Sequence, residues 1–268
     1  MNLYNRDYLN GLLPDEQAAY EAVLKKEKEG MPGRFRKNLY SQYSLAARNC
    51  LSLFPNNHLD IFDLKTNAQA SRLNEDFHNL LLTETVGERE ILSYINQTPA
   101  FHIIGSILRG CHLGFGHHSA YLFPEFPLGT SYQADYLIIG KNSGGHEFVF
   151  VELESPRGNI TIQDGDLGNS FRKGIIQVKD WRRWLQENYA MLSEYFERCK
   201  SKDEALPKEF CKYDDTRIHY VVVSGMRSSF TEKTYRIARE HKDNDKIHLL
   251  HYENLVDFSC QILDLPTY

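Results

Sequence analysis

Long hydrophobic runs, paired cysteines and nucleotide-binding signatures are all missing from this 268-residue chain. No stretch approaches the roughly 18 apolar residues that a membrane-spanning helix needs, so we expect no membrane segment. The five cysteines are scattered and form no C-x-x-C pair, which argues against a disulfide framework or a zinc cluster. The polar N-terminus lacks a secretion signal, so we expect a cytoplasmic protein. No Walker, Rossmann or G-x-S-x-G motif is present.

Excess positive charge is missing too, because the formal net charge is -5. Phosphate binding depends largely on lysine and arginine, so any nucleic-acid contact must be local. One predicted helix gathers such a basic strip, and from it we select as DNA-contact candidates Lys173, Lys179, Arg182 and Arg183. Hydrophobic residues at 41% and charged residues at 25% otherwise describe an ordinary globular protein.

Two regions differ in their predicted secondary structure. Residues 1–85 are expected to be helical, with one helix beginning at Pro14 and others over residues 40–54 and 68–82. Residues 86–268 mix both kinds of element. The expected order is a helix at 88–96, strands at 120–126, 132–139 and 147–154, a long helix at 170–189, a strand at 217–224, a helix at 231–241, a strand at 247–251 and a helix at 253–263. The pattern predicts an α/β domain with a mixed sheet flanked by helices.

Three carboxylates interrupt two neighbouring apolar strands of this domain. Glu152 and Glu154 in VELES are two residues apart, so they point to the same face about 7 Å apart, and Asp135 in QADYLII belongs to the strand before. Buried carboxylates need a cation, a basic partner or protonation. Magnesium favours such hard oxygen ligands, and the backbone carbonyl of Leu153 would be a further one.

The alternative for these acids is structural: each lies at a strand end in solvent or pairs with a basic residue. The helix that follows favours a functional site, because Gln177 and Trp181 are spaced to share one face with Lys173 and Trp184. Gln177 could hydrogen-bond a phosphate or a metal-bound water. The same helix could equally pack its tryptophans on the sheet and expose a solvated basic face.

The motifs of residues 85–265 resemble those of the Shedu anti-phage defence proteins, whose C-terminal domain belongs to the PD-(D/E)XK nuclease superfamily. The likeness is carried, in family order, by EREILSYINQTP, LFPEFPLGTSYQADYLI, FVFVELESP, IIQVKDWRRWLQEN and YVVVSGMRSSFTEKTYRIA. The resemblance implies a restriction-endonuclease-like fold over residues 86–268. Residues 1–85 lie outside it, as a region of regulation or assembly.

The resemblance also implies roles for individual residues. Glu88 matches the acidic residue of the leading helix, Asp135 the motif aspartate, Glu152 the following glutamate and Gln177 the glutamine of the later helix. Asp135 and Glu152 would then hold magnesium, or manganese in its place. Glu154 departs from the family, which has lysine there to orient the attacking water and offset charge. Arg157 and Lys173 are candidate substitutes for that lysine.

Two functions follow from this departure. An active E-x-E site would make the protein a metal-dependent DNA endonuclease or nickase in phage defence, with Glu154 as general base or extra ligand. A weakened site would leave a DNA-binding or DNA-end-sensing module on a nuclease fold. A purely structural interaction protein is a third, weaker interpretation. The expected partners are phage double-stranded DNA or its ends and, since cutting two strands benefits from pairing, further copies in a dimer or tetramer.

Overall fold

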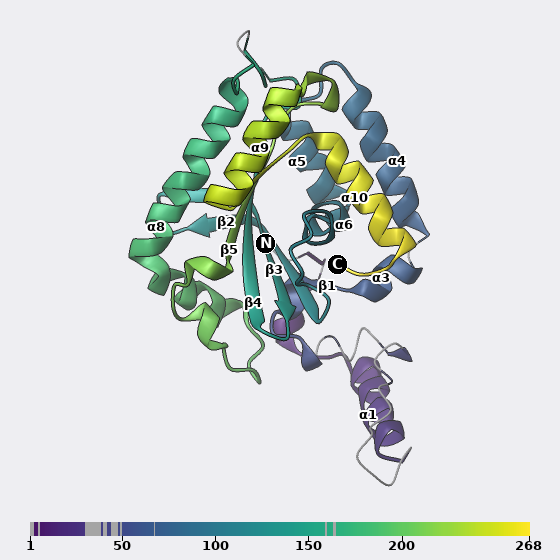
Figure 1. The fold of residues 1–268 in the computed structure, drawn as a ribbon. Coiled ribbons are helices and arrows are strands. Elements are labelled where there is room, and N and C mark those ends of the chain that lie inside the picture. The colour runs from purple at the N-terminus through teal and green to yellow at the C-terminus, as the bar shows by residue number, and fades with distance from the viewer. Residues whose placement is uncertain are drawn as a thin grey trace.

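The protein is described by a computed structural model, which places residues 3–4, 6–29, 39, 42–43, 48, 50–66, 68–158, 160–162 and 165–268. Its centre is a six-stranded mixed sheet in the order β1-β2-β3-β4-β5-β6 (Figure 1). The strands are β1 (His58–Leu59), β2 (Ser119–Leu128), β3 (Tyr132–Asn142), β4 (Gly145–Leu153), β5 (Ile218–Val223) and β6 (Ile247–Leu250). Strands β1 to β4 pair antiparallel, whereas β4, β5 and β6 pair parallel.

Helices cover both faces of the sheet. The helices that the structure describes are α1 (Pro14–Glu29), α3 (Ile61–Thr66), α4 (Gln69–Leu82), α5 (Glu88–Gln97), α6 (Phe101–Gly105), α7 (Ile107–Gly110), α8 (Asn169–Cys199), α9 (Glu232–Asp245) and α10 (Tyr252–Asp264), with short 3-10 turns at Tyr8–Asn10, Pro55–Asn57, Lys208–Phe210, Asp215–Arg217 and Arg227–Ser229. In Figure 1, α8 and α9 lie on one side of the sheet, and α4, α5, α6 and α10 on the other. The predicted α/β architecture is confirmed at this level. None of the described helices is long and apolar enough to cross a membrane.

Strand β4 shows why two layers form. Its side chains alternate between faces, so Val149 and Val151 enter the core beneath α5 and α10, while Phe148 and Phe150 enter the core beneath α8. The alternation of side chains along a strand thus divides these residues between two cores. A tight turn joins β3 to β4, because the Gly144 N–H donates to Asn142 Oδ1 at 2.7 Å. The strands extend further into this connector than the sequence suggested.

The N-terminal region contributes to the same core. The helix predicted from Pro14 is α1, which extends away from the sheet in Figure 1, and the helix predicted over 68–82 is α4. Seven of the 15 residues of the helix predicted over 40–54 lie outside the described residues, and residues 52–54 at its predicted end are not helical. Phe77 and Leu81 of α4 are fully buried with the residues of α5 and α10. The sequence did not predict strand β1, which pairs with β2 and forms one edge of the sheet.

Candidate active site

The carboxylates lie where two neighbouring strands separate. The pairing of β3 with β4 ends at Tyr136 opposite Val151, but β3 continues its pairing with β2 as far as Tyr132. Beyond the last β3–β4 pair, the Leu153 N–H donates instead to Asp135 Oδ2 at 2.7 Å. The carboxylate of Asp135 thus replaces a backbone acceptor. The opening between the two strands leaves room for the side chains beside it.

Strand β2 is distorted at the same level. Glu125 has a φ of +49°, in the left-handed region that glutamate rarely adopts, although the register of β2 and β3 is kept on both sides of it. Bulges and local kinks of this kind are common beside active sites, where they re-aim side chains. The kink therefore lies next to Asp135, the residue whose placement matters most for the candidate site.

Both glutamates of the VELES strand are buried. Only 5% of Glu152 and 4% of Glu154 is exposed, and Asp135 is half-buried. Glu152 Oε2 and Glu154 Oε1 are enclosed and have no hydrogen-bond partner among the described residues. Solvent exposure, one form of the structural alternative, is excluded for these two glutamates, whereas the other form, pairing with a basic residue, is seen for Glu154 with Lys173. A buried oxygen without a donor is costly, so each of these two atoms needs a proton, a water molecule or a bound cation as its partner.

The electrostatics of the site follow from this burial. Burial raises the pKa of Glu152 well above its usual range, and the charges of Asp135 and Glu154 raise it further. Burial likewise raises the pKa of Asp135, while the hydrogen bond from Leu153 opposes the shift. The carboxylate of Glu88, in the first turn of α5, also raises the pKa of each of these three groups. All four predicted acids therefore share one electrostatic site.

Helix α8 brings a cation to the acids. Lys173 Nζ lies 3.0 Å from Glu154 Oε2, which lowers the pKa of Glu154 against the larger opposing effect of burial. The next residue, Gly174, permits this approach, since a Cβ there would lie 2.5 Å from Val222 Cγ1 and 3.3 Å from Glu154 Cγ. A glycine inside a helix costs about 1 kcal/mol relative to alanine, so its presence in the sequence was a signal of close packing.

The prediction that Gln177 and Trp181 share one face of α8 with Lys173 is correct only for Gln177. Gln177 is half-buried and lines a hollow with Lys173, one helical turn away. Trp181, however, is fully buried in the core with Val178 and Leu185. Each step of four residues rotates about 40° around a helix, so two steps carry Trp181 from the Lys173 face to the buried stripe. Trp181 is therefore a packing residue.

Arg157, the other candidate substitute for the missing lysine, binds the end of α4 instead of the acids. The Arg157 guanidinium donates to the carbonyls of Leu81 at 2.6 Å and Thr83 at 3.0 Å. These carbonyls lie at the C-terminal end of α4, where a cation is favourable. Lys173 is thus the candidate that contacts the acids.

The remaining predicted DNA contacts have local partners. Lys179 Nζ lies 3.4 Å from Asp245 Oδ2, Arg182 donates to the Asp245 carbonyl and stacks over Tyr220, and Arg183 pairs with Asp180. These partners belong to α8 itself, β5 and the end of α9. Lys173, by contrast, faces the acidic site. The predicted basic strip is therefore divided, and its DNA contacts stay a prediction.

The donor set fits a hard divalent cation. Magnesium is commonly held by one or two carboxylates together with water and substrate phosphate, and Asp135 and Glu152 supply two. Within the described ranges, no group of three or more His, Cys, Asp or Glu side chains is arranged to hold a metal ion. The backbone of Leu153, a predicted ligand through its carbonyl, contacts Asp135 through its N–H. The fit thus rests on two carboxylates and the partnerless oxygen of Glu152.

A comparison with protein families decides the assignment. Residues 85–256 match the family model described as Shedu protein SduA, C-terminal. The chain belongs to the Shedu SduA family. The match covers α5 through the start of α10, so the carboxylates, Lys173 and Gln177 all lie within it. Membership places this Shedu protein among the anti-phage defence proteins. No curated protein matches the chain.

Proposed function

We propose that this Shedu protein is a divalent-metal-dependent DNA endonuclease or nickase on a PD-(D/E)XK-type fold, acting on phage DNA. The observation that carries the proposal is the pair of buried, partnerless oxygens of Glu152 and Glu154 beside Asp135. Stable proteins pair nearly all of their buried polar atoms, and exceptions with shifted pKa values concentrate at functional sites. Family membership in phage defence supports nucleic acid as the target.

The residues would divide the work as follows. Asp135, held by the Leu153 N–H, and Glu152 would bind Mg²⁺ or Mn²⁺ through oxygen atoms. A bound metal would supply positive charge at the scissile phosphate and make a water molecule more acidic. Glu154, whose pKa burial raises, is suited to accept the proton of that water. Glu88 adds negative charge that strengthens cation binding.

Lys173 would replace the lysine that the family has at the position of Glu154. Its ammonium group reaches the site from α8 rather than from β4, and it lies 3.0 Å from Glu154 Oε2. Only its head group is needed near the phosphate, and its side chain is 63% exposed, so it can turn toward a bound strand. A cation at this place would offset the charge that develops on the phosphate.

A second function is favoured by the same ion pair. If Lys173 serves only to neutralise Glu154, the site keeps two carboxylates and lacks a free cation, as in a DNA-binding or DNA-end-sensing module.

Plasmid DNA separates the two functions. The full chain is incubated with supercoiled plasmid and Mg²⁺ or Mn²⁺, beside Asp135→Ala, while DNA binding is measured in parallel. Nicking or linearisation that Asp135→Ala abolishes, with binding retained, supports the nuclease. Binding without cleavage, unchanged by Asp135→Ala, supports the module.

A further inference from the structure

A broad hollow lies beside the carboxylates, between the β2–β3 turn and the first turns of α8. Its volume is about 770 Å³, and the lining residues that matter here are Tyr132, Gln133, Arg172, Lys173, Ile176 and Gln177. Lys173 belongs both to this hollow and to the acidic site, through its contact with Glu154 at 3.0 Å. Lys173 therefore links the hollow to the candidate active site.

The walls of the hollow combine three kinds of group. Tyr132 is 37% exposed and Ile176 is 60% exposed, which gives it an aromatic and an aliphatic surface. Arg172 and Lys173 supply positive charge, Asp180 supplies one negative charge that pairs with Arg183, and the amides of Gln133 and Gln177 supply donors and acceptors. Aromatic side chains next to cations are the combination by which proteins hold unpaired nucleotides, since bases stack on the ring while the cations meet phosphate.

The position of Tyr132 is fixed by the turn that precedes it. Gly129 has a φ of +62°, and a Cβ there would lie 2.8 Å from Cζ2 of Trp184. The turn is thus pressed against α8, and its glycine allows that approach. Tyr132 begins β3, three residues before Asp135. Strand β3 therefore carries both the exposed ring and the predicted metal ligand.

We propose that this hollow binds an unpaired nucleotide of the DNA strand that enters the active site, with its base stacked on Tyr132 and its phosphates near Arg172 and Lys173. In an intact duplex each base face is covered by its neighbours, so the ring offers nothing to fully paired DNA. The preferred substrate is therefore DNA with a locally unpaired strand. The inference rests on the proposed function and specifies its substrate.

Binding without metal tests the inference apart from cleavage. Fluorescence anisotropy compares a hairpin whose stem is fully paired and whose loop is a non-nucleotide linker with the same hairpin carrying a short gap in its stem, both in EDTA. The wild-type chain is expected to bind the gapped DNA more tightly. Tyr132→Ala should weaken binding of the gapped DNA by roughly tenfold and leave the paired hairpin unchanged, whereas Tyr132→Phe keeps the stacking face and the affinity. A 2-aminopurine in the gap should be quenched by the wild type and not by Tyr132→Ala.

Tyr235 offers a matched control. It lies on α9, is 40% exposed and packs beside Phe230, so Tyr235→Ala removes a comparable ring outside the hollow. Equal affinity of the wild type for both hairpins, or equal loss in Tyr132→Ala and Tyr235→Ala, overturns the inference. A chain that nicks plasmid without this preference refutes the hollow alone. A chain that shows the preference without nicking refutes the nuclease alone.

Discussion

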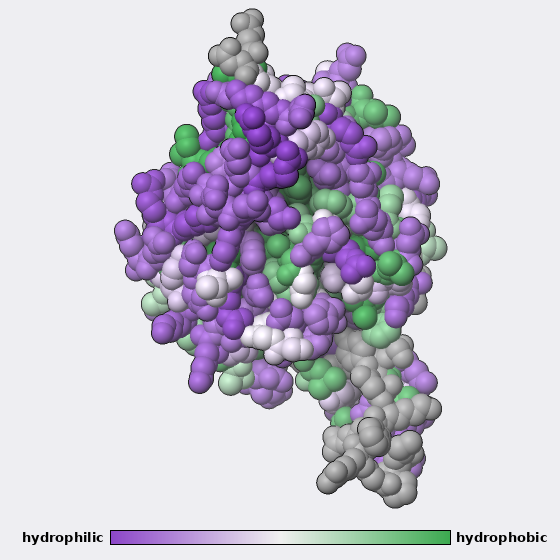
Figure 2. All heavy atoms as spheres, viewed as in Figure 1, coloured by the Kyte–Doolittle hydropathy of each residue, from purple (hydrophilic) through white to green (hydrophobic). Residues whose placement is uncertain are grey.

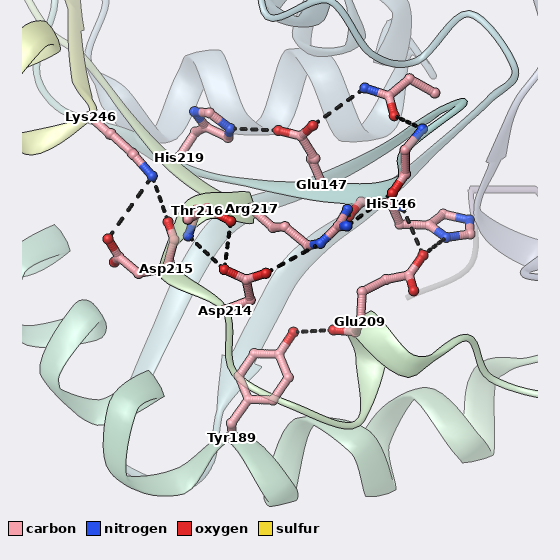
Figure 3. Close-up of polar contacts among 12 residues, drawn as sticks. His146, Glu147, Tyr189, Glu209, Asp214, Asp215, Thr216, Arg217, His219 and Lys246 are labelled. Atoms are coloured by element: carbon pink, nitrogen blue, oxygen red, sulfur yellow. Dashed lines mark hydrogen bonds and ion pairs between the residues drawn. The ribbon is translucent and has the colours of Figure 1, made fainter.

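The two ends of strand β4 differ in whether their charged side chains have hydrogen-bond partners. At its start, His219 Nε2 lies 2.9 Å from Glu147 Oε2, and His146 Nδ1 lies 2.8 Å from Glu209 Oε1 (Figure 3). At its end, the buried oxygens of Glu152 and Glu154 have no donor among the described residues. A satisfied network stabilises the fold by itself. An unsatisfied one costs stability and is retained where a ligand completes it.

The surroundings of the first network show how complete it is. Arg217 donates to the carbonyls of His146 at 3.2 Å and Gly144 at 2.9 Å, and it pairs with Asp214 at 3.5 Å (Figure 3). Lys246 Nζ donates to the Asp215 carbonyl at 2.7 Å. Charge alone therefore does not mark a site. In Figure 2, hydrophilic residues also cover much of the surface over α9, which carries none of the candidate site residues.

Removing the cation of the acidic end should have the largest effect. Lys173→Met is expected to lower the initial rate of plasmid nicking by about 100-fold, because charge on the phosphate is then not offset. Lys173→Arg should restore part of the rate. The control at the other end is Lys246→Asn, which removes a lysine but suits the left-handed backbone at φ +53°. Unchanged nicking by Lys173→Met would contradict this role.

Metal affinity should depend on pH at the acidic end. Burial raises the pKa values of Asp135 and Glu152, so protons compete with the cation across neutral pH. Mg²⁺ affinity is expected to rise with pH between about 5.5 and 8, by up to about tenfold per unit for each proton displaced. Isothermal titration calorimetry measures it. A pH-independent affinity would be inconsistent with binding at these carboxylates.

Replacing a glutamate by glutamine should change the melting temperature in opposite directions at the two ends of β4. This effect is expected to be smaller than those on the nicking rate and on metal affinity. Glu152 has a raised pKa, so the fold loses stability as pH rises above the pKa of the unfolded state, because the unfolded chain releases a proton that the folded chain keeps. Glu152→Gln is therefore expected to raise the melting temperature of the metal-free protein at pH 8 by roughly 2–4 °C.

The opposite sign applies to Glu209. Burial alone would raise its pKa, but hydrogen bonds from its own backbone and from His146 hold the pKa below its usual value. Its contribution to stability is present above the unfolded pKa and lost as pH falls through the folded one. Glu209→Gln should then lower the melting temperature at pH 8. Shifts of the same sign in both variants, measured by thermal denaturation, would refute the contrast between the two ends.

Sequence periodicity was sufficient for most of the fold. The alternation of side chains between the two faces of β4 and the apolar stripe of α8 depend on local sequence patterns. Both could therefore be predicted from the spacing of apolar residues. The convergence of Glu88 with Asp135 came from the family resemblance. The site details depend on long-range geometry: the partner of Lys173, the diversion of Arg157 to α4 and the burial of Trp181 all arise from packing between distant segments. Strand β1 was missed because two residues carry no periodic signal.

Cleavage by two isosteric variants of one strand tests the central claim most directly. Purified wild type, Glu152→Gln and Glu147→Gln are compared in time courses of supercoiled plasmid nicking with Mg²⁺ at pH 8. Both changes remove one carboxylate from β4 and keep its shape. The wild type and Glu147→Gln should nick the plasmid at similar rates, and Glu152→Gln should be slower by at least about 100-fold. Equal nicking by Glu152→Gln and the wild type would contradict the assignment of this carboxylate cluster as the active site.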